Sequence, residues 1–333
     1  MMKRMIALTM TTMMAVMAFT GCGGTQKTEE ENQNTNQEQT ADSGKQYVIG
    51  ISQYGQHASL DNCREGFLLG LEESGLVEGK DFVVDYQNAG FDDNITQQIA
   101  QSFSAKNVDL MCAIATPSAT ACYAAAEDKN IPAKLDNAPN ITGTSDKLPI
   151  DGQMQFIREL QPDAKTIGIL YTTSEPNSVS AVKEYQEKAA QYGFEIEALG
   201  VTQQSEVVQA ADTLISKKVD CFTNLTDNNV VGVLPSILEK TNAANIPVYG
   251  SEIEQVKLGC VASAGIEYIS LGKQTGAMAA KILKGEATAD DMPYETITDF
   301  QRYINTDALA SLGITISDTV MAESIDVTKE TAE

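Results

Sequence analysis

The chain of 333 residues contains no tryptophan and only one histidine, His57. None of its six cysteines form a Cys-x-x-Cys pair. Zinc sites and Cys-His nucleophile pairs need clustered cysteine and histidine, so the sequence excludes both. It also lacks a Gly-x-Ser-x-Gly elbow and a glycine-rich phosphate loop. We therefore expect no metal, no cofactor and no catalytic residues.

Basic residues are scarce as well. Lys and Arg together number 23 against 46 Asp and Glu, which gives a net charge of −23. Binding to nucleic acid needs a basic patch, so this balance argues against nucleic acid as a partner. The simplest explanation of the acidic surface is solubility.

The amino-terminal segment, residues 1–22, has the features of a signal peptide. Two basic residues precede an apolar run from Met5 to Phe19, which is too short to span a membrane comfortably. The run leads into Thr20-Gly21-Cys22, which is similar to a bacterial lipobox, although Phe19 stands where Leu is usual. We expect Cys22 to be lipidated; ordinary secretion is the alternative. Residues 23–46 have almost no apolar side chain and predict a disordered tether.

The stretch from Val108 to Ala121 predicts half of a binding site. Leu110 to Ala115 is a continuous apolar run, typical of a strand buried on both faces. Thr116 and Pro117 then form a helix-start signal. Such a junction directs backbone N–H groups and hydroxyls toward a carboxylate or a phosphate.

Strand and helix patterns alternate from Tyr47 onward, and the whole order then repeats. Three short motifs recur with a period of about 115 residues, too long for a solenoid. They are Ile49-Gly-Ile with Ile167-Gly-Ile, Val108-Asp with Val219-Asp, and Asn130-Ile-Pro with Asn245-Ile-Pro. Strands are expected at 47–53, 82–87, 110–115, 165–171, 194–201, 219–225, 259–265 and 299–304. This repeat predicts an α/β fold of two Rossmann-like domains with parallel sheets.

Several motifs resemble one family when taken in order. In the first half they are Ile49-Gly-Ile-Ser-Gln53, Ala115-Thr-Pro-Ser-Ala119 and Asn140-Ile-Thr-Gly-Thr-Ser-Asp146. In the second half they are Ser174-Glu-Pro-Asn-Ser178, Thr226-Asp-Asn228 and Ile246-Pro-Val-Tyr-Gly-Ser-Glu252. From Tyr47 to Ile316 the chain resembles the periplasmic-binding-protein-like lipoproteins of ABC uptake systems, in the subfamily associated with aromatic amino acids.

The resemblance implies two lobes joined by three crossover strands and closing on one small ligand. The N-terminal lobe would comprise residues 47–142 and 252–293, the C-terminal lobe 143–251 and 294–318, and residues 319–333 would be a frayed tail. An ABC permease and an ATPase are the implied partners. The protein would be extracytoplasmic, held by its lipid anchor alone at the outer face of the bacterial cytoplasmic membrane.

The ligand is expected at the carboxyl ends of the strands, where five loops converge. For an aromatic or hydrophobic L-amino acid, Thr116, Ser118 and the Ala119 amide would bind the carboxylate. Asp227 is the first choice for the ammonium, followed by Glu175 and Glu252, and Tyr54 or Tyr171 would line a side-chain pocket. The remaining candidates are Ser52, Gln53, Ser174, Asn177, Ser178, Asn228 and Ser251. Taken singly, such residues commonly serve only as helix caps.

Alternatives of other classes stay open. The same fold could present its ligand to a receptor as a sensor, the ligand could be a nucleoside, and an enzyme is less favoured.

One departure from the family also matters. After Asn130-Ile-Pro132 the chain continues with Ala133 to Ala138 and passes directly to Asn140. The first lobe is therefore expected to lack a strand and its loop.

Overall fold

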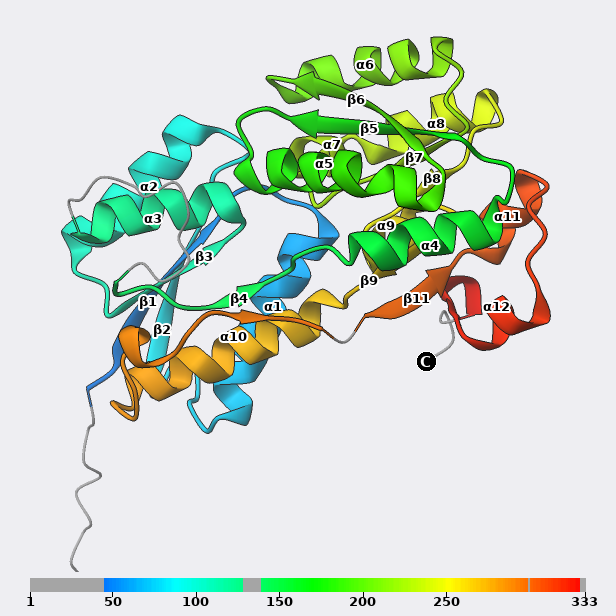
Figure 1. The fold of residues 1–333 in the computed structure, drawn as a ribbon. Coiled ribbons are helices and arrows are strands. Elements are labelled where there is room, and N and C mark those ends of the chain that lie inside the picture. Colours follow the sequence, from blue (N-terminus) through cyan, green and yellow to red (C-terminus); the bar gives the residue numbers. More distant parts are fainter. Residues whose placement is uncertain (1–44, 128–138, 299, 330–333) are drawn as a thin grey trace, which may run out of the picture. The chain divides into compact units, whose positions relative to one another are not determined.

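The computed structural model describes residues 45–127, 139–298 and 300–329 (Figure 1). Cys22, nearly all of the expected tether and the Ala133–Ala138 segment lie outside the described residues. Within the described ranges the strands form three sheets. No helix in these ranges is long and apolar enough to cross a membrane.

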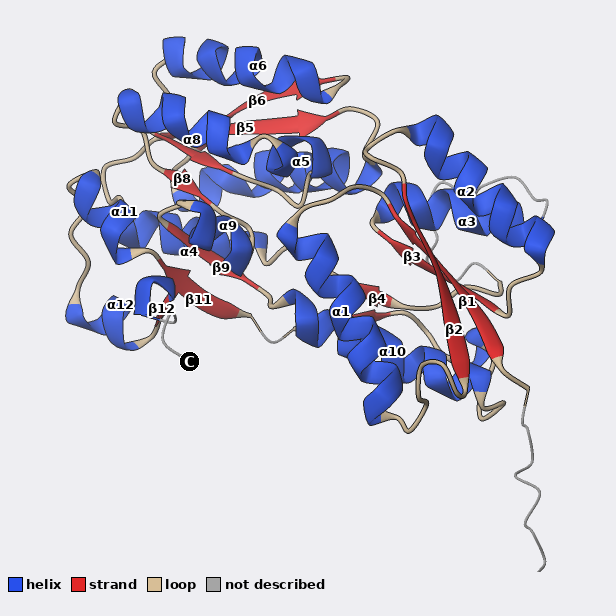
Figure 2. Ribbon diagram, turned by 180° about the vertical axis from the view of Figure 1, so that it is seen from behind, coloured by secondary structure: helices blue, strands red, loops and turns tan. Residues whose placement is uncertain are grey.

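The first lobe is built on a three-stranded parallel sheet in the order β2-β1-β3. Its strands are β1 (Tyr47–Gln53), β2 (Phe82–Asn88) and β3 (Leu110–Ile114). Side chains alternate between the two faces of β1, so Ile49 and Ile51 pack in one core while Gly50 faces Phe103 on the other side. Four helices cover these faces: α1 (Ala58–Glu73), α2 (Asp93–Lys106), α3 (Thr116–Glu127) and α10 (Tyr268–Leu283) (Figure 2).

Helices α1 and α10 approach each other through glycines. A Cβ atom added to Gly66 of α1 would lie 2.1 Å from the carbonyl oxygen of Ile269, and one added to Gly276 of α10 would lie 2.2 Å from that of Phe67. Gly70 and Gly272 are equally enclosed. The two backbones therefore touch, which fixes α1 firmly. This matters for the site because the start of α1 faces the second lobe.

The second lobe contains a seven-stranded sheet in the order β12-β11-β9-β8-β7-β5-β6. All neighbouring strands are parallel except β9 and β11, which are antiparallel. The strands are β5 (Thr166–Thr172), β6 (Glu195–Val201), β7 (Cys221–Thr223), β8 (Val248–Tyr249), β9 (Ala262–Gly265), β11 (Gln301–Ile304) and β12 (Ile325–Asp326).

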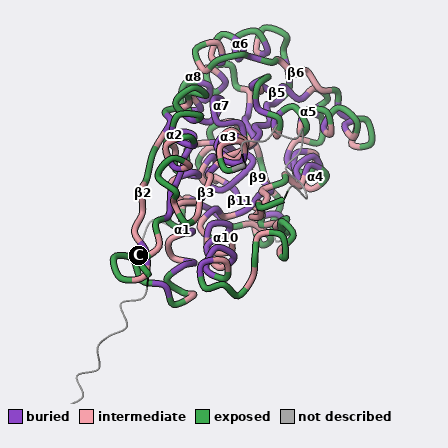
Figure 3. Tube along the Cα trace, turned by 90° about the vertical axis from the view of Figure 1, so that its left-hand side faces the viewer, coloured by how far each residue is buried: buried purple, intermediate pink, exposed green. Residues whose placement is uncertain are grey.

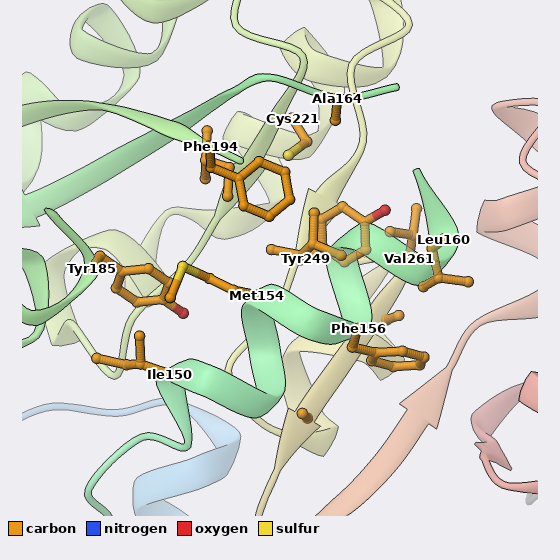
Figure 4. Packing of buried hydrophobic residues seen from close by; sticks show 14 of the residues in the cluster. Ile150, Met154, Phe156, Leu160, Ala164, Tyr185, Phe194, Cys221, Tyr249 and Val261 are labelled. Atoms are coloured by element: carbon orange, nitrogen blue, oxygen red, sulfur yellow. The ribbon is translucent and has the colours of Figure 1, made fainter. Parts of the chain in front are cut away.

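Helices pack on both faces of this sheet. They are α4 (Ile150–Leu160), α5 (Pro176–Lys188), α6 (Gln204–Ser216), α7 (Asn228–Gly232), α8 (Leu234–Ala243), α9 (Ile253–Leu258), α11 (Thr306–Ser311) and α12 (Asp318–Ala322), with 3-10 turns η1 (Ala189–Tyr192) and η3 (Val327–Lys329). In the larger core, Ile150 and Met154 of α4 lie with Tyr185, Phe194 and Tyr249 (Figure 4). Buried residues concentrate along the strands and the inward sides of the helices (Figure 3).

The chain crosses between the lobes three times, as the family resemblance implies. One crossover contains β4 (Thr144–Ser145), a second links β9 to α10 at Ile266 and Glu267, and a third contains β10 (Glu295–Thr296). Strands β4 and β10 pair in parallel, with Glu295 opposite Thr144. A short 3-10 turn, η2 (Ala289–Asp291), precedes β10.

Three features differ from the sequence-based expectations. Placing residues 252–293 wholly in the first lobe is wrong for 252–265, because β9 pairs with β8 and β11 in the second sheet. The expected frayed tail is also wrong up to residue 329, because Val320 and Val327 are buried and β12 pairs with β11. Helices α4 and α9 were not expected. The other domain boundaries stay predictions.

The described cysteines are free thiols. Cys63, Cys112, Cys122, Cys221 and Cys260 are all free, and all but Cys63 are buried. Burial raises the pKa of each of these thiols, which keeps them protonated.

Candidate functional site

A cavity of about 1910 Å³ lies between the lobes and continues along β3. From the first lobe, the start of α1 and the start of α3 line it. From the second lobe, the starts of α5, α7 and α9 do so. Each of these starts follows the carboxyl end of a parallel strand, where α/β sheets bind ligands. The predicted residues that line it are Thr116, Ala119, Asn177, Asn228 and Glu252.

Three hydrogen bonds join the start of α1 to the second lobe across this cavity. Ser59 Oγ donates to Glu252 Oε1 at 3.2 Å. His57 Nε2 lies 3.4 Å from Asn228 Oδ1, and Asn62 Nδ2 donates to Glu254 Oε1 at 3.1 Å. The lobes therefore touch through polar side chains that can separate without exposing a hydrophobic core.

Glu252 is a buried carboxylate on the cavity wall. It is the N-cap of α9 and accepts hydrogen bonds from the backbone N–H groups of Glu254, at 2.7 Å, and Gln255, at 3.0 Å. Burial nevertheless raises the pKa of Glu252 to about 7. The donors are too few to offset the loss of solvation, so a cation beside this carboxylate would stabilise it.

Asp146 is a second carboxylate on the same wall, in the first crossover. Tyr268 OH donates to its Oδ2 at 2.7 Å, and both residues line the cavity. Burial raises the pKa of Asp146. Asp146 lies in a motif that carries the family resemblance, but its role was not predicted, and neither were those of Ser59 and Tyr268. These residues lie outside the strand-end loops that the sequence argument considered.

Asp227, the predicted ammonium partner, already accepts hydrogen bonds from groups of the protein. It is fully buried and accepts from Thr172 N at 2.6 Å, Thr172 Oγ1 at 2.8 Å and Val230 N at 3.1 Å. It is the N-cap of α7 and is not among the residues that line the cavity. Helix capping, the simpler of the two interpretations of Asp227, therefore fits this geometry better.

Glu175 lies beside Asp227, beneath the cavity wall. It accepts from the backbone N–H of Asn228 at 3.2 Å and from Asn228 Nδ2 at 2.7 Å. Burial, followed by the nearby Asp227, raises the pKa of Glu175 to about 8. The bonds to Glu175 orient the Asn228 side chain so that its oxygen faces His57.

At the start of α3 the predicted carboxylate site is only partly available. The Ala119 amide donates to the carbonyl oxygen of Ala115 at 3.0 Å, so the prediction that this amide binds the ligand is wrong. Ser118 is fully buried and shares a hydrogen bond with Ser52, with 3.4 Å between the two oxygens. Thr116, the first residue of the helix, remains on the cavity wall.

The other predicted residues lie away from the cavity. Tyr171 packs beside Gly200 of the neighbouring strand, within the second lobe. Gln53 bonds to Gly55, Asp61 and Arg64, while Ser251 bonds to Gln255. Tyr54 and Ser174 line a separate cavity of about 290 Å³. Ser178 is buried and makes no side-chain hydrogen bond in the described part of the chain.

Two buried polar atoms of residues that line the large cavity have no hydrogen-bond partner among the described residues. Asn177 Nδ2 donates to the carbonyl oxygen of Thr226 at 3.1 Å, so its Oδ1 is left without a partner among the described residues. The ring Nδ1 of His57 is in the same situation. No ion pair among the described residues involves Glu252 or Asp146, and no cluster of metal-ligating residues occurs there. The site therefore suits a ligand group that is cationic and rich in donors.

A family model for ABC transporter substrate-binding proteins matches residues 48–328. The chain therefore belongs to this family, whose members are solute-binding proteins and not enzymes. The family match and its solved relatives also confirm the periplasmic-binding-protein-like fold.

Named relatives are similar over nearly the whole chain. A tyrosine-binding protein of Clostridioides difficile is 35% identical over 324 residues, covering 93% of this chain and 92% of its own. An ABC domain in complex with L-Trp from Streptococcus pneumonia is 30% identical with a TM-score of 0.79, covering 85% and 99%. A ligand-free, open substrate-binding protein from Clostridium difficile is 36% identical with a TM-score of 0.61, covering 84% and 98%.

Proposed function

We propose that this protein is the substrate-binding lipoprotein of an ABC uptake system and that its ligand is an aromatic or hydrophobic L-amino acid. The observation that carries the proposal is the pair of carboxylates on the cavity wall, buried Glu252 and half-buried Asp146, neither of which has an ion pair among the described residues. Lys147 also lines the cavity, but its ammonium pairs with Glu184 at 3.6 Å. An α-ammonium group supplies the missing charge and up to three hydrogen-bond donors.

The opposite side of the cavity suits the rest of such a ligand. The start of α3, with Thr116, carries the partial positive charge of a helix N-terminus and would accept the α-carboxylate. Apolar side chains including Leu60, Phe67 and Ile114 also line the cavity and leave room for a hydrophobic side chain. The tyrosine-binding relative and the L-Trp complex support this ligand class.

We infer that the structure represents the closed form. Its TM-score is 0.79 with the L-Trp complex but 0.61 with the ligand-free open protein, although the open protein has the higher sequence identity. Sequence divergence alone would give the reverse order. The hydrogen bonds between α1 and the second lobe support the same conclusion, since hinge closure brings such residues together.

The remaining parts of the proposal come from the sequence. The lipobox at Cys22 and the tether that follows would hold the protein at the outer face of the cytoplasmic membrane, where the permease and ATPase of the same system would receive the ligand. Labelling with a clickable fatty acid tests the anchor: the wild-type chain should be labelled and found in membranes, and Cys22→Ser should be neither.

Calorimetric titration of the purified protein tests the ligand. L-tyrosine, L-tryptophan, L-phenylalanine and L-leucine are compared with D-tyrosine, a nucleoside and glucose. Tight binding is expected for one or more of the L-amino acids, together with a higher melting temperature, because the ligand binds the folded state alone. Binding of the nucleoside or glucose with no response to any amino acid would overturn the assignment.

A further inference from the structure

His57 occupies a position where a histidine is unexpected. It is the N-cap of α1, a place where Ser, Thr, Asp or Asn usually caps the helix with its side chain, yet the His57 side chain makes no capping bond. It is also the only histidine in the chain. A residue that breaks a local preference without a local benefit commonly serves the site it faces, and His57 lines the cavity between the lobes.

Its neighbours determine which ring nitrogen carries the proton. Asn228 Nδ2 donates to Glu175 Oε2 at 2.7 Å, so the Asn228 oxygen is the atom that faces His57. That oxygen can only accept, and therefore His57 Nε2, 3.4 Å away, is the protonated nitrogen. Burial lowers the pKa of His57, which keeps the imidazole neutral at pH 7. The second nitrogen, Nδ1, is consequently left with a lone pair.

No described residue donates a hydrogen bond to that lone pair. Nδ1 is buried and makes no hydrogen bond within the described residues. The contact between Nε2 and the Asn228 oxygen favours this orientation of the ring, which lies parallel to Phe91, with 6.3 Å between centroids and 7° between planes. Phe91 is itself held against Gly55, where a Cβ atom would lie 1.9 Å from its ring. A fixed, buried acceptor without a donor is costly unless a ligand supplies the donor.

We propose that His57 determines specificity by accepting a hydrogen bond at Nδ1 from the α-ammonium of the ligand. Ser59, two residues along, bonds to Glu252, so the neutral acceptor and the charged one belong to the same end of the cavity. Glu252 supplies charge, and His57 supplies direction through the relay Glu175–Asn228–His57. This inference rests on the proposed amino-acid ligand, and it adds that a ligand without a primary ammonium loses this contact.

Two substitutions distinguish the roles of the two ring nitrogens of His57. The side-chain oxygen of His57→Asn falls near the Nδ1 position, so this variant keeps an acceptor there and loses the contact to Asn228. The amide of His57→Gln reaches the Nε2 position, so it keeps that contact and has no acceptor at Nδ1. We expect His57→Gln to lose about 10- to 100-fold in affinity for L-tyrosine or L-tryptophan, and His57→Asn to stay within about threefold of wild type.

The ligand without its ammonium provides the decisive comparison. The des-amino analogue of L-tyrosine, 3-(4-hydroxyphenyl)propionate, should bind wild type and His57→Gln equally, because there is no ammonium to lose. An equal loss for both ligands would show a structural role and overturn the proposal. A wild-type protein that binds no amino acid at all would instead refute the proposed function. Melting curves confirm that each variant is folded.

A single histidine also permits a direct measurement. In untagged protein labelled with ¹⁵N, the two imidazole resonances belong to His57 alone. We expect a protonated Nε2 and an unprotonated Nδ1 in the free protein, with the Nδ1 resonance moving upfield when L-tyrosine is added, as acceptance of a hydrogen bond requires. An unchanged Nδ1 resonance in the bound protein would overturn the proposal even if the affinities behaved as expected.

Discussion

The hydroxyl of Ser59 on the first lobe donates to the buried carboxylate of Glu252 on the second, with 3.2 Å between the oxygens. This bond joins the lobes at a charge that burial alone disfavours, since the pKa of Glu252 is raised to about 7. In the proposed function, ligand binding and lobe closure therefore both involve the Glu252 carboxylate. Five predictions concern this carboxylate, its buried neighbours Asp227 and Glu175, and the helix that carries Ser59.

Replacing Glu252 by Gln should weaken binding and spare the fold. The amide keeps an oxygen for the N-cap of α9 but loses the charge that holds an ammonium. Affinity for the amino acid should fall about 10- to 100-fold, while the ligand-free protein should be as stable or more stable, because a buried charge has been removed. Calorimetric titration and thermal melts measure the two effects.

Glu254→Gln is the matched control for Glu252→Gln. Glu254 lies on the same helix and also bonds across the lobes, to Asn62 at 3.1 Å, but it does not line the cavity. The affinity of this variant should stay within about threefold of wild type, because the amide keeps an oxygen for Asn62 and the half-buried side chain does not face the cavity. Equal losses in the two variants would show that the contact between lobes matters and the charge does not.

Replacing Asp227 by Ala should cost stability rather than specificity. Three donors would lose their buried acceptor: the N–H and hydroxyl of Thr172 and the N–H of Val230. We expect the free energy of unfolding to fall by about 2–4 kcal/mol, with binding retained at temperatures where the variant is folded. Urea unfolding and titration at low temperature check this. A stable variant that cannot bind the amino acid would contradict this prediction and indicate that Asp227 binds the ammonium.

The stability of the free protein should fall as pH rises. Glu252 and Glu175 have folded-state pKa values of about 7 and about 8, above the ordinary value of 4.5. The folded state thus binds more protons, so this stability is complete below pH 4.5 and is lost as pH rises through 7 and 8. Melting temperatures from pH 5 to 8.5, without ligand, should show the decline.

Ligand binding should have the opposite pH dependence. An ammonium binds the ionised form of Glu252, so affinity should rise with pH and level off above about 7. Protonation of His57 at low pH acts in the same direction, because an imidazolium repels the ammonium. The increase in melting temperature caused by the ligand should therefore grow from pH 5 to 7.5. A constant increase would contradict a titrating carboxylate at the site.

Replacing Gly66 by Ala should disrupt the packing of α1 against α10. The start of α1 carries His57 and Ser59. The added methyl would lie 2.1 Å from the Ile269 carbonyl oxygen, so α1 and α10 would have to separate. We expect a loss of more than about 2 kcal/mol in stability together with weaker binding. Gly152→Ala is the control: its nearest neighbour, Pro149 Cβ, is 3.8 Å away, and the variant should be about 0.5–1 kcal/mol more stable. Denaturant unfolding compares them.

Much of the fold could be predicted because its signals are local. The first strand occupies Tyr47–Gln53 as expected, and the other expected strands agree with the structure to within a few residues. Helix α9 has only six residues, too few for a periodic pattern. Strand β9 was assigned to the wrong lobe because its membership depends on pairing with β8 and β11, which no local pattern reports.

The site shows the same limit at the level of single side chains. Tyr171 and Thr172 are neighbours at the end of β5, and only the alternation of the strand decides that Thr172 bonds to Asp227 while Tyr171 packs beside Gly200. The place of Asp146 on the cavity wall was not predicted, because Asp146 lies in a crossover that is distant in sequence from the strand-end loops that also line the cavity.

The sequence by itself determined the order of strands and helices, the repeat that makes two lobes, and the polar residues that follow the strands. The tertiary structure decided which carboxylate is open to a ligand. Asp227 and Glu252 both end a strand and cap a helix, and nothing local distinguishes them. Asp227 takes its three donors from its own lobe and does not line the cavity. Glu252 lies on the cavity wall and takes one of its three donors, Ser59, from the other lobe. The cavity between the lobes is formed by residues far apart in the chain, and a place on its wall determines which of the two charges a ligand can reach.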